Sequence, residues 1–223
     1  MNLREELYRY QDLDYKDFHK KLIPNIDEDL LIGVRVPMLR QIAKQALAEN
    51  AENELYYYEE KMVYGMTLGL KNCSLDEHKQ DIKKFVPLID NWAVCDCCAS
   101  SFKFTAKNLD GMYDFILSYV GKGEYETRFA VVMLMNYYLV DEYIDRVIDV
   151  LTSIKSDYYY VNMAVAWALS FAFIKYESKV MPIIQSRTLR REVQNKTIQK
   201  IKESTRVSKV VKQGLNVYKY KSN

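Results

Sequence analysis

Apolar residues recur at helical spacing along almost the whole chain. After Pro37, for example, Leu39, Ile42, Ala43 and Leu47 follow one another at intervals of three and four residues. Pro37 suits a first helical turn, and Ser74 and Asp157 are predicted helix N-caps. The pattern predicts helices that cover residues 2–10, 14–22, a segment that opens at 36–37, 54–70, 74–86, 88–105, 108–119, 123–139, 141–154, 157–175, 177–185, 187–203 and 205–217.

The predicted helices alternate between two kinds. Residues 128–135 and 162–169 are almost entirely apolar, whereas 141–154 is amphipathic and charged. Such pairs, with a period of about 35–40 residues, are typical of stacked HEAT-like repeats. The sequence therefore predicts an all-α, HEAT-like superhelix of antiparallel helix pairs with a concave face, as a single domain over 1–223. A globular helical bundle is the alternative.

Composition agrees with this interpretation. The 223 residues are 49% hydrophobic and include only seven Gly and four Pro, fewer than a sheet-rich chain of this size usually needs. The start, Met1–Glu6, is charged and does not resemble a signal peptide, and the apolar run 163–174 is shorter than the roughly 20 residues that span a bilayer. We expect a cytoplasmic monomer with no cofactor.

Charge is distributed unevenly along the chain. The net charge is +2, but residues 186–223 carry eleven Lys or Arg against Glu192 and Glu203. The remainder of the chain is therefore acidic. The basic C-terminal helices could attract a phosphate backbone, or they could be ordinary solvated helices.

Polar residues within apolar helices are candidates for chemistry. Asp96 lies among apolar and cysteine neighbours and is four residues from Trp92, so the two share a helical face. A carboxylate expected to be buried needs a partner or a function, and a structural Asp is the alternative. Arg128 begins one apolar helix and could pair with Asp96, bind phosphate, or pair with Glu124 or Glu126.

Trp167 is flanked by alanines in another apolar helix and could line a groove or fill the core. Asp96 and Arg128 are 32 residues apart, and Arg128 and Trp167 are 39 apart. Because these spacings are close to the repeat period, the three residues are predicted to occupy equivalent positions on three consecutive inner helices.

At these positions the chain resembles the AlkD-like DNA alkylation repair family, over roughly residues 1–215. Four ordered motifs carry the resemblance: Gly33-Val-Arg-Val-Pro-Met-Leu-Arg40, Trp92-x-x-x-Asp96, Glu126-Thr-Arg128 and Ala166-Trp-Ala-Leu169. The family often has a Tyr where this chain reads Leu22–Ile26, and some members have a second Trp where it has Asn91.

The resemblance implies a monofunctional DNA glycosylase that removes N3- and N7-alkylated purines from duplex DNA. It implies that Asp96 is the catalytic carboxylate and that Trp92 and Trp167 pack against the damaged nucleotide. Arg128 would lie near the DNA backbone. The other basic residues expected to bind DNA are Arg35, Arg40, Lys103, Arg187, Arg190, Arg191, Lys196 and Lys200. A DNA-binding relative without activity, for damaged or branched DNA, and a protein-binding HEAT scaffold are the alternatives.

Other clusters indicate less. Cys95, Cys97 and Cys98 point in divergent directions on a helix and lack a second ligand pair, so we expect buried thiols and no metal. The tyrosine runs 56–58 and 158–160 could stack on DNA, but packing at helix junctions is the favoured interpretation.

Overall fold

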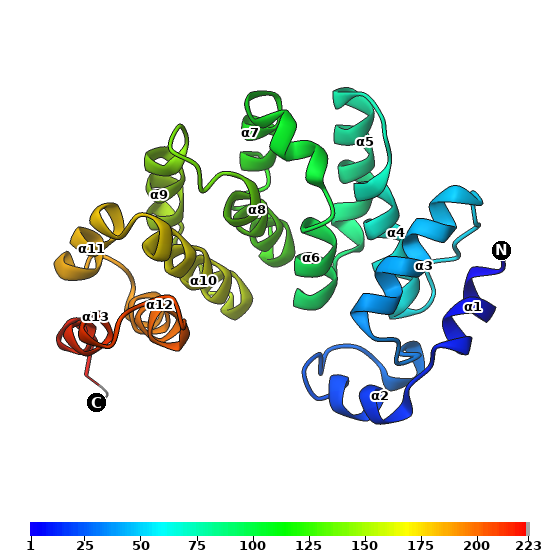
Figure 1. Ribbon diagram of the computed structural model, residues 1–223, viewed down its shortest axis with the longest axis horizontal. Helices are drawn as coiled ribbons and strands as arrows, with labels where there is room; N and C mark the ends of the chain where they lie inside the picture. Colours follow the sequence, from blue (N-terminus) through cyan, green and yellow to red (C-terminus); the bar gives the residue numbers. More distant parts are fainter. Residues whose placement is uncertain (222–223) are drawn as a thin grey trace. The chain divides into compact units, whose positions relative to one another are not determined.

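The computed structural model describes residues 1–221, and every regular element in that range is helical. Thirteen α-helices follow one another along this described part of the chain (Figure 1). The α-helices are α1 Leu3–Arg9, α2 Leu13–His19, α3 Val36–Ala48, α4 Tyr58–Leu70, α5 Leu75–Phe85, α6 Trp92–Ala99, α7 Leu109–Leu117, α8 Glu124–Tyr137, α9 Ile144–Ser153, α10 Tyr159–Lys175, α11 Glu177–Ser186, α12 Arg191–Glu203 and α13 Lys209–Gly214. Short 3₁₀ turns are η1 Glu28–Leu30, η2 Val86–Leu88, η3 Lys103–Lys107 and η4 Leu215–Tyr218.

The predicted all-α class and its packed helix pairs are confirmed. The chain forms two compact units, Met1–Phe115 and Ile116–Asn223, with the boundary inside α7. A single repeat domain over the whole chain stays a prediction. No helix within residues 1–221 is both long and apolar enough to cross a membrane.

In the first unit, α4 is the central helix and packs against α3, α5 and α6. Gly65 of α4 makes the close approach of α6 possible. A Cβ atom at this position would lie 2.4 Å from the Phe85 ring and 2.7 Å from Cys98 Sγ, closer than real Cβ contacts allow. The absence of a side chain at Gly65 therefore lets α6 pack directly against the α4 backbone.

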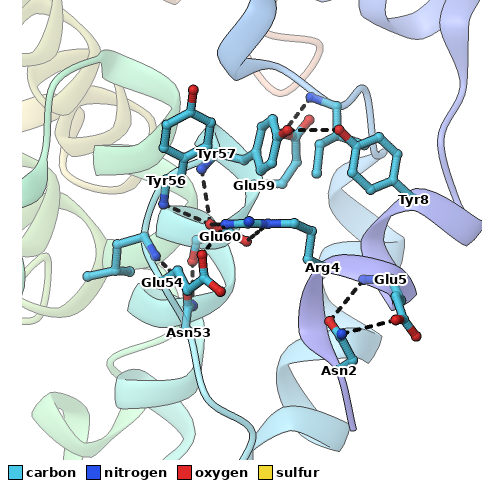
Figure 2. A network of polar contacts seen from close by, with 12 residues as sticks. Asn2, Arg4, Glu5, Tyr8, Asn53, Glu54, Tyr56, Tyr57, Glu59 and Glu60 are labelled. Carbon is cyan, nitrogen blue, oxygen red and sulfur yellow. Dashed lines mark hydrogen bonds and ion pairs between the residues drawn. The ribbon is translucent and has the colours of Figure 1, made fainter.

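Two neighbouring glutamates at the start of α4 attach it to distant segments. The buried Glu60 carboxylate accepts hydrogen bonds from Arg4 Nε at 2.9 Å and from the backbone N–H groups of Tyr56 and Tyr57 at 2.7 and 3.1 Å (Figure 2). The Tyr57 hydroxyl also accepts a hydrogen bond from Tyr8 at 3.0 Å. These contacts join α1 to α4, and they place Tyr57 at a helix junction, as the favoured interpretation of the tyrosine run predicted.

Glu59 holds the loop before α3. Its fully buried carboxylate accepts the backbone N–H groups of Ile32, Gly33 and Val34 at 2.9, 2.6 and 3.2 Å. Burial raises the Glu59 pKa, although the three hydrogen bonds oppose that rise. Gly33 has a φ of +99°, a left-handed conformation that glycine adopts without strain. The Gly33-x-x-x-Pro37 motif is thus a loop closed by a buried acid, with Pro37 in the first turn of α3 as predicted.

In the second unit, α10 is the central helix and packs against α8, α9, α11 and α12. Four of its alanines, Ala164, Ala166, Ala168 and Ala172, are fully buried, which lets neighbouring helices approach closely. The outer helix α9 buries one face, made of Ile144, Val147, Ile148 and Leu151, as its amphipathic pattern predicted.

Two local predictions are wrong. The helix predicted over 88–105 is interrupted, because α6 covers only Trp92–Ala99 between η2 and η3. Asp157 is not the N-cap of α10, since Tyr158 occupies that position and Asp157 pairs with Arg190 at 3.0 Å. Ser74 is confirmed as an N-cap, because its hydroxyl accepts the Glu77 N–H while the Glu77 carboxylate accepts the Ser74 N–H.

Both histidines are buried. His19 Nε2 lies 3.0 Å from the Tyr58 hydroxyl, and the His78 ring contacts the ring of Phe104 at a centroid distance of 4.7 Å. Burial lowers the pKa of both imidazoles, and nearby Asp81 only partly offsets this for His78. Both side chains are therefore neutral in the folded protein at pH 7.

Acidification from pH 7.5 to 5.5 should lower the free energy of unfolding. Below about pH 6.5 the unfolded chain takes up protons that the folded chain does not, which costs up to about 1.4 kcal/mol per pH unit for each histidine. Urea unfolding at the two pH values measures this. A His19→Gln/His78→Leu variant should lose less stability over the same interval, and an equal loss in both proteins would contradict the assignment.

Candidate functional site

The first turn of α6 is set by Asn91, which is fully buried at its N-cap. The Asn91 side-chain oxygen accepts the N–H groups of Ala93 and Val94, both at 2.9 Å, and its amide donates to Asp90 Oδ1 at 2.8 Å. Asp90 in turn forms an ion pair with Lys61 of α4 at 2.5 Å. The cap fixes where α6 begins, and therefore which of its residues face α4.

Trp92 and Asp96 lie one turn apart on the face of α6 that is not buried. Ala93, Val94, Cys95, Cys98 and Ala99 fill the core, whereas Trp92, Asp96 and Cys97 are partly exposed. The expectation of a buried Asp96 is therefore wrong. The residue lies among apolar neighbours in sequence, but helical geometry turns most of those neighbours inward and leaves Asp96 partly exposed.

The loop after α2 holds the Trp92 indole. Trp92 Nε1 donates to the Leu22 carbonyl oxygen at 2.8 Å, and Asn25 Nδ2 donates to the Asp90 carbonyl oxygen at 2.5 Å. This loop includes the Leu22–Ile26 segment. Here the segment orients an indole from the backbone, with no aromatic side chain of its own.

Two basic side chains lie at the end of α6, and a third lies at the start of α3 in the same unit. Arg40 of α3 donates from Nη2 to Ser100 Oγ at 3.0 Å, and exposed Lys103 begins η3. Arg35, at the start of α3, pairs with Asp12 at 2.8 Å, lies over the Tyr15 ring, and is 60% exposed. The first unit thus combines a partly exposed carboxylate and indole with nearby cations.

The thiols of α6 are packing groups. Cys95 and Cys98 are buried, and Cys98 Sγ donates to the Met62 carbonyl oxygen at 3.4 Å. Burial, and secondarily the charge of Asp96, raises the pKa of Cys97 to about 11. Among residues 1–221 no group of three His, Cys, Asp or Glu side chains is arranged to hold a metal ion.

In the second unit, Arg128 and Glu124 of α8 bind Tyr160 in the first turn of α10. Arg128 is only 5% exposed and its Nη1 donates to the Tyr160 carbonyl oxygen at 2.6 Å, while Glu124 accepts the Tyr160 N–H at 3.1 Å. The Tyr125 ring stacks on the Tyr160 ring at 6.0 Å. Arg128 therefore connects α8 to the helix that carries Trp167.

Trp167 is partly exposed near the middle of α10, on a turn whose other residues are buried. Its ring meets Phe171 edge-on, with ring centroids 5.8 Å apart. It does not simply fill the core, because it lines an open groove together with Phe171, Ile174, and residues of α12 and the following loop.

The basic tail binds its own chain to a large extent. Residues 215–221, which we call the C-terminal strap, lie along α12. Arg187 and Arg191 donate to the carbonyl oxygens of Val217 and Lys221, and the Asn195 amide pairs with both the N–H and the carbonyl of Tyr220.

The other predicted basic residues of this unit also have partners. Arg190 pairs with Asp157 and Glu192, at 3.0 and 2.8 Å. Lys196 donates to Gln199 at 3.1 Å, and Lys200 pairs with Glu203 at 3.0 Å. These cations keep their charge, so their attraction for phosphate does not vanish, but the arginine side chains are also structural.

Sequence reasoning did not find the contacts through which three residues organise these surfaces, namely Asn91, Glu59 and Tyr160. Asn91 had a readable signal, because an Asn followed by an apolar helical run is a typical N-cap. Tyr160 packs at a helix junction, as the favoured interpretation of the tyrosine run 158–160 predicted, but its partner Arg128 lies 32 residues away in sequence. Glu59 had no signal, since its partner Gly33 lies 26 residues away.

The fold and these surfaces define a class of helical-repeat protein, with paired helices that present an acid, indoles and cations. The chain belongs to the DNA alkylation repair enzyme family, whose sequence model matches residues 3–206. That description gives DNA as the substrate. A comparison with curated proteins found no significant match.

The Cys97 thiol should react slowly in the native protein, because a pKa of about 11 leaves almost no thiolate at pH 7.5. Labelling with a maleimide, followed by peptide mass spectrometry, measures its reaction rate. We expect at least about tenfold faster labelling in denaturant, where the pKa returns to about 8.5. Complete labelling of native Cys97 within minutes would contradict the raised pKa of this thiol.

Proposed function

We propose that the chain is a monofunctional DNA glycosylase that releases N3- and N7-alkylated purines from duplex DNA, acting in the cytoplasm as a monomer. The observation that carries the proposal is the open face of α6, where Asp96 and Trp92 lie one turn apart on a helix whose other face is buried. The DNA alkylation repair family makes DNA the substrate.

The chemistry suits a single carboxylate. An N3- or N7-alkylated purine is cationic, so the bond from its nitrogen to the sugar C1′ breaks with the electron pair moving to the base. The base leaves neutral and needs no general acid. Positive charge develops on the sugar, where an ionised Asp96 would stabilise it and orient the water that adds to C1′. Aromatic faces also attract a cationic sugar.

Each unit would bring its own set of residues to the DNA. Trp92 is oriented for this role by its hydrogen bond to the Leu22 carbonyl, and Arg40 and Lys103 supply charge beside it. In the other unit, Trp167 would pack against the nucleotide backbone. Because Arg128 is buried, we assign it the task of positioning α10 through Tyr160, in addition to any attraction for phosphate.

Asp96→Asn should abolish base release while leaving DNA binding nearly unchanged. Removing one stabilising charge from a transition state typically costs about 100-fold or more in rate. Duplex DNA containing N7-methylguanine, assayed under single-turnover conditions for free base and abasic sites, measures the effect. Asp149→Asn makes the same chemical change on an exposed face of α9 and should release base at the wild-type rate.

Two results would contradict the assignment. Base release that persists in Asp96→Asn removes this residue from the proposed role. Tight DNA binding by the wild-type protein, with no release of any alkylated purine, would instead favour a non-catalytic DNA-binding function.

DNA affinity should fall steeply with added salt, because phosphate contacts release condensed counterions. Lys103→Gln should reduce the slope of log affinity against log salt by about 0.9, the value for one lost phosphate contact. Lys179→Gln is the control, since Lys179 of α11 pairs with Asp145 at 2.6 Å. Affinity that does not depend on salt would favour a protein-binding scaffold, and equal slopes for Lys103→Gln and wild type would exclude Lys103 from the interface.

A further inference from the structure

A groove of about 370 Å³ runs beside Trp167, wholly within the second unit. One wall comes from α10 and the other from the end of α12 and the loop that follows it. The lining residues are Trp167, Ser170, Phe171, Ile174, Lys200, Glu203, Ser204, Thr205 and Arg206.

The α10 wall is aromatic and apolar. Trp167, Phe171 and Ile174 follow one another at spacings of four and three residues, so they lie on one face of the helix. A helix that is apolar all round is normally covered on every side. Here this face is left partly open, and Phe171 is 36% exposed. The open face extends the Trp167 surface by about two helical turns, or about 10 Å.

The opposite wall is cationic. The Arg206 guanidinium lies over the Phe171 ring, 5.4 Å from its centroid, and the Ser204 hydroxyl accepts the Arg206 N–H at 3.2 Å, which shapes the loop. Glu203 is paired with Lys200, so its charge is largely compensated. Arg206 is exposed and forms no ion pair with any residue in the described part of the chain. An exposed guanidinium that lies over an aromatic ring is suited to bind phosphate.

We propose that this groove is a second DNA subsite, which holds the nucleotide next to the one that Trp167 contacts. Phe171 packs against the sugar or base of that nucleotide, and Arg206 binds its phosphate. The inference rests on the proposed function in that it takes DNA as the occupant. It adds two residues, Phe171 and Arg206, that belong to none of the motifs described above.

Charge favours a nucleic acid strand over an acidic protein segment. Lys196 and Lys202 add further cations on α12, the helix whose C-terminal end lines the groove. The alternation of an aromatic face with a cation also matches the alternation of sugar or base with phosphate along a strand. The subsite would hold the strand and take no part in bond cleavage, so it should affect affinity and KM but not the single-turnover rate at saturation.

The first experiment compares Arg206→Gln and Phe171→Leu with wild type, using fluorescence anisotropy on alkylated duplex DNA. We expect the Kd to rise about fivefold to tenfold for each, and the salt slope to fall by about one for Arg206→Gln alone. Lys209→Gln is the matched control, because it removes one cation from the next helix without touching the groove. Its Kd should change less than about twofold. Circular dichroism and thermal melting confirm that each variant is folded.

The second experiment locates the phosphate. Single neutral methylphosphonate linkages are placed in turn around the lesion, and the Kd of wild type and of Arg206→Gln is measured for each duplex. We expect one linkage whose neutralisation weakens DNA binding by the wild-type protein. At that same linkage, the Kd of Arg206→Gln should equal its Kd for the unmodified duplex. Arg206→Lys keeps the charge but not the planar group, so it should restore the salt slope and only part of the affinity.

The outcomes separate this inference from the proposed function. If wild type releases base but both groove variants bind like wild type, the subsite is wrong and the glycosylase assignment stands. If every methylphosphonate weakens binding by wild type and by Arg206→Gln to the same extent, the proposed contact between Arg206 and phosphate is wrong. A lower single-turnover rate at saturation in Arg206→Gln, with an unchanged Kd, would also overturn the proposed subsite. A contact that only holds the strand does not act on the chemical step. Failure of the proposed function would show instead as absence of base release in wild type.

Discussion

The packing of α6 against α4 is the contact on which the proposed catalytic surface depends. An α-helix of eight residues has little stability of its own, so its position comes from the core and from its cap. Gly65 removes the side chain that would hold α6 away from α4, and Asn91 fixes the residue at which the helix begins. A shift of one residue in that start would rotate Asp96 by about 100°.

Buried polar contacts have a second task in this protein, which is to hold loops and helix ends that carry exposed groups. Glu59 closes the loop that presents Arg35, and Arg128 with Glu124 binds the first turn of the helix that presents Trp167. A buried charge persists only when it is hydrogen-bonded, so each of these residues links two segments strongly. The surface side chains proposed to contact DNA are thus positioned by polar groups that are mostly buried.

The basic tail shows why net charge alone is a poor guide to a binding surface. The structure assigns Arg187, Arg190 and Arg191 to contacts with the C-terminal strap, with Asp157 and with Glu192. Arg206 was not singled out by its sequence, yet it stands beside an open aromatic groove without an ion-pair partner among residues 1–221. A cation becomes a recognition element when its charge is not neutralised locally and a shaped surface lies beside it.

The amino-acid sequence alone determined the all-helical class, the alternation of apolar and amphipathic helices, and the family, because these depend on short-range periodicity and on motifs readable in order. It also identified Trp92 and Asp96 as neighbours on one face, which follows from their spacing on a helix. It failed to show that Asp96 is partly exposed and that a separate cap and 3₁₀ turns interrupt the segment 88–105. Those features depend on which face α4 covers and on partners such as Lys61 and Leu22, which are distant in sequence. Only tertiary packing decides between two faces of a helix, since both satisfy the same local geometry and differ only in what lies against them.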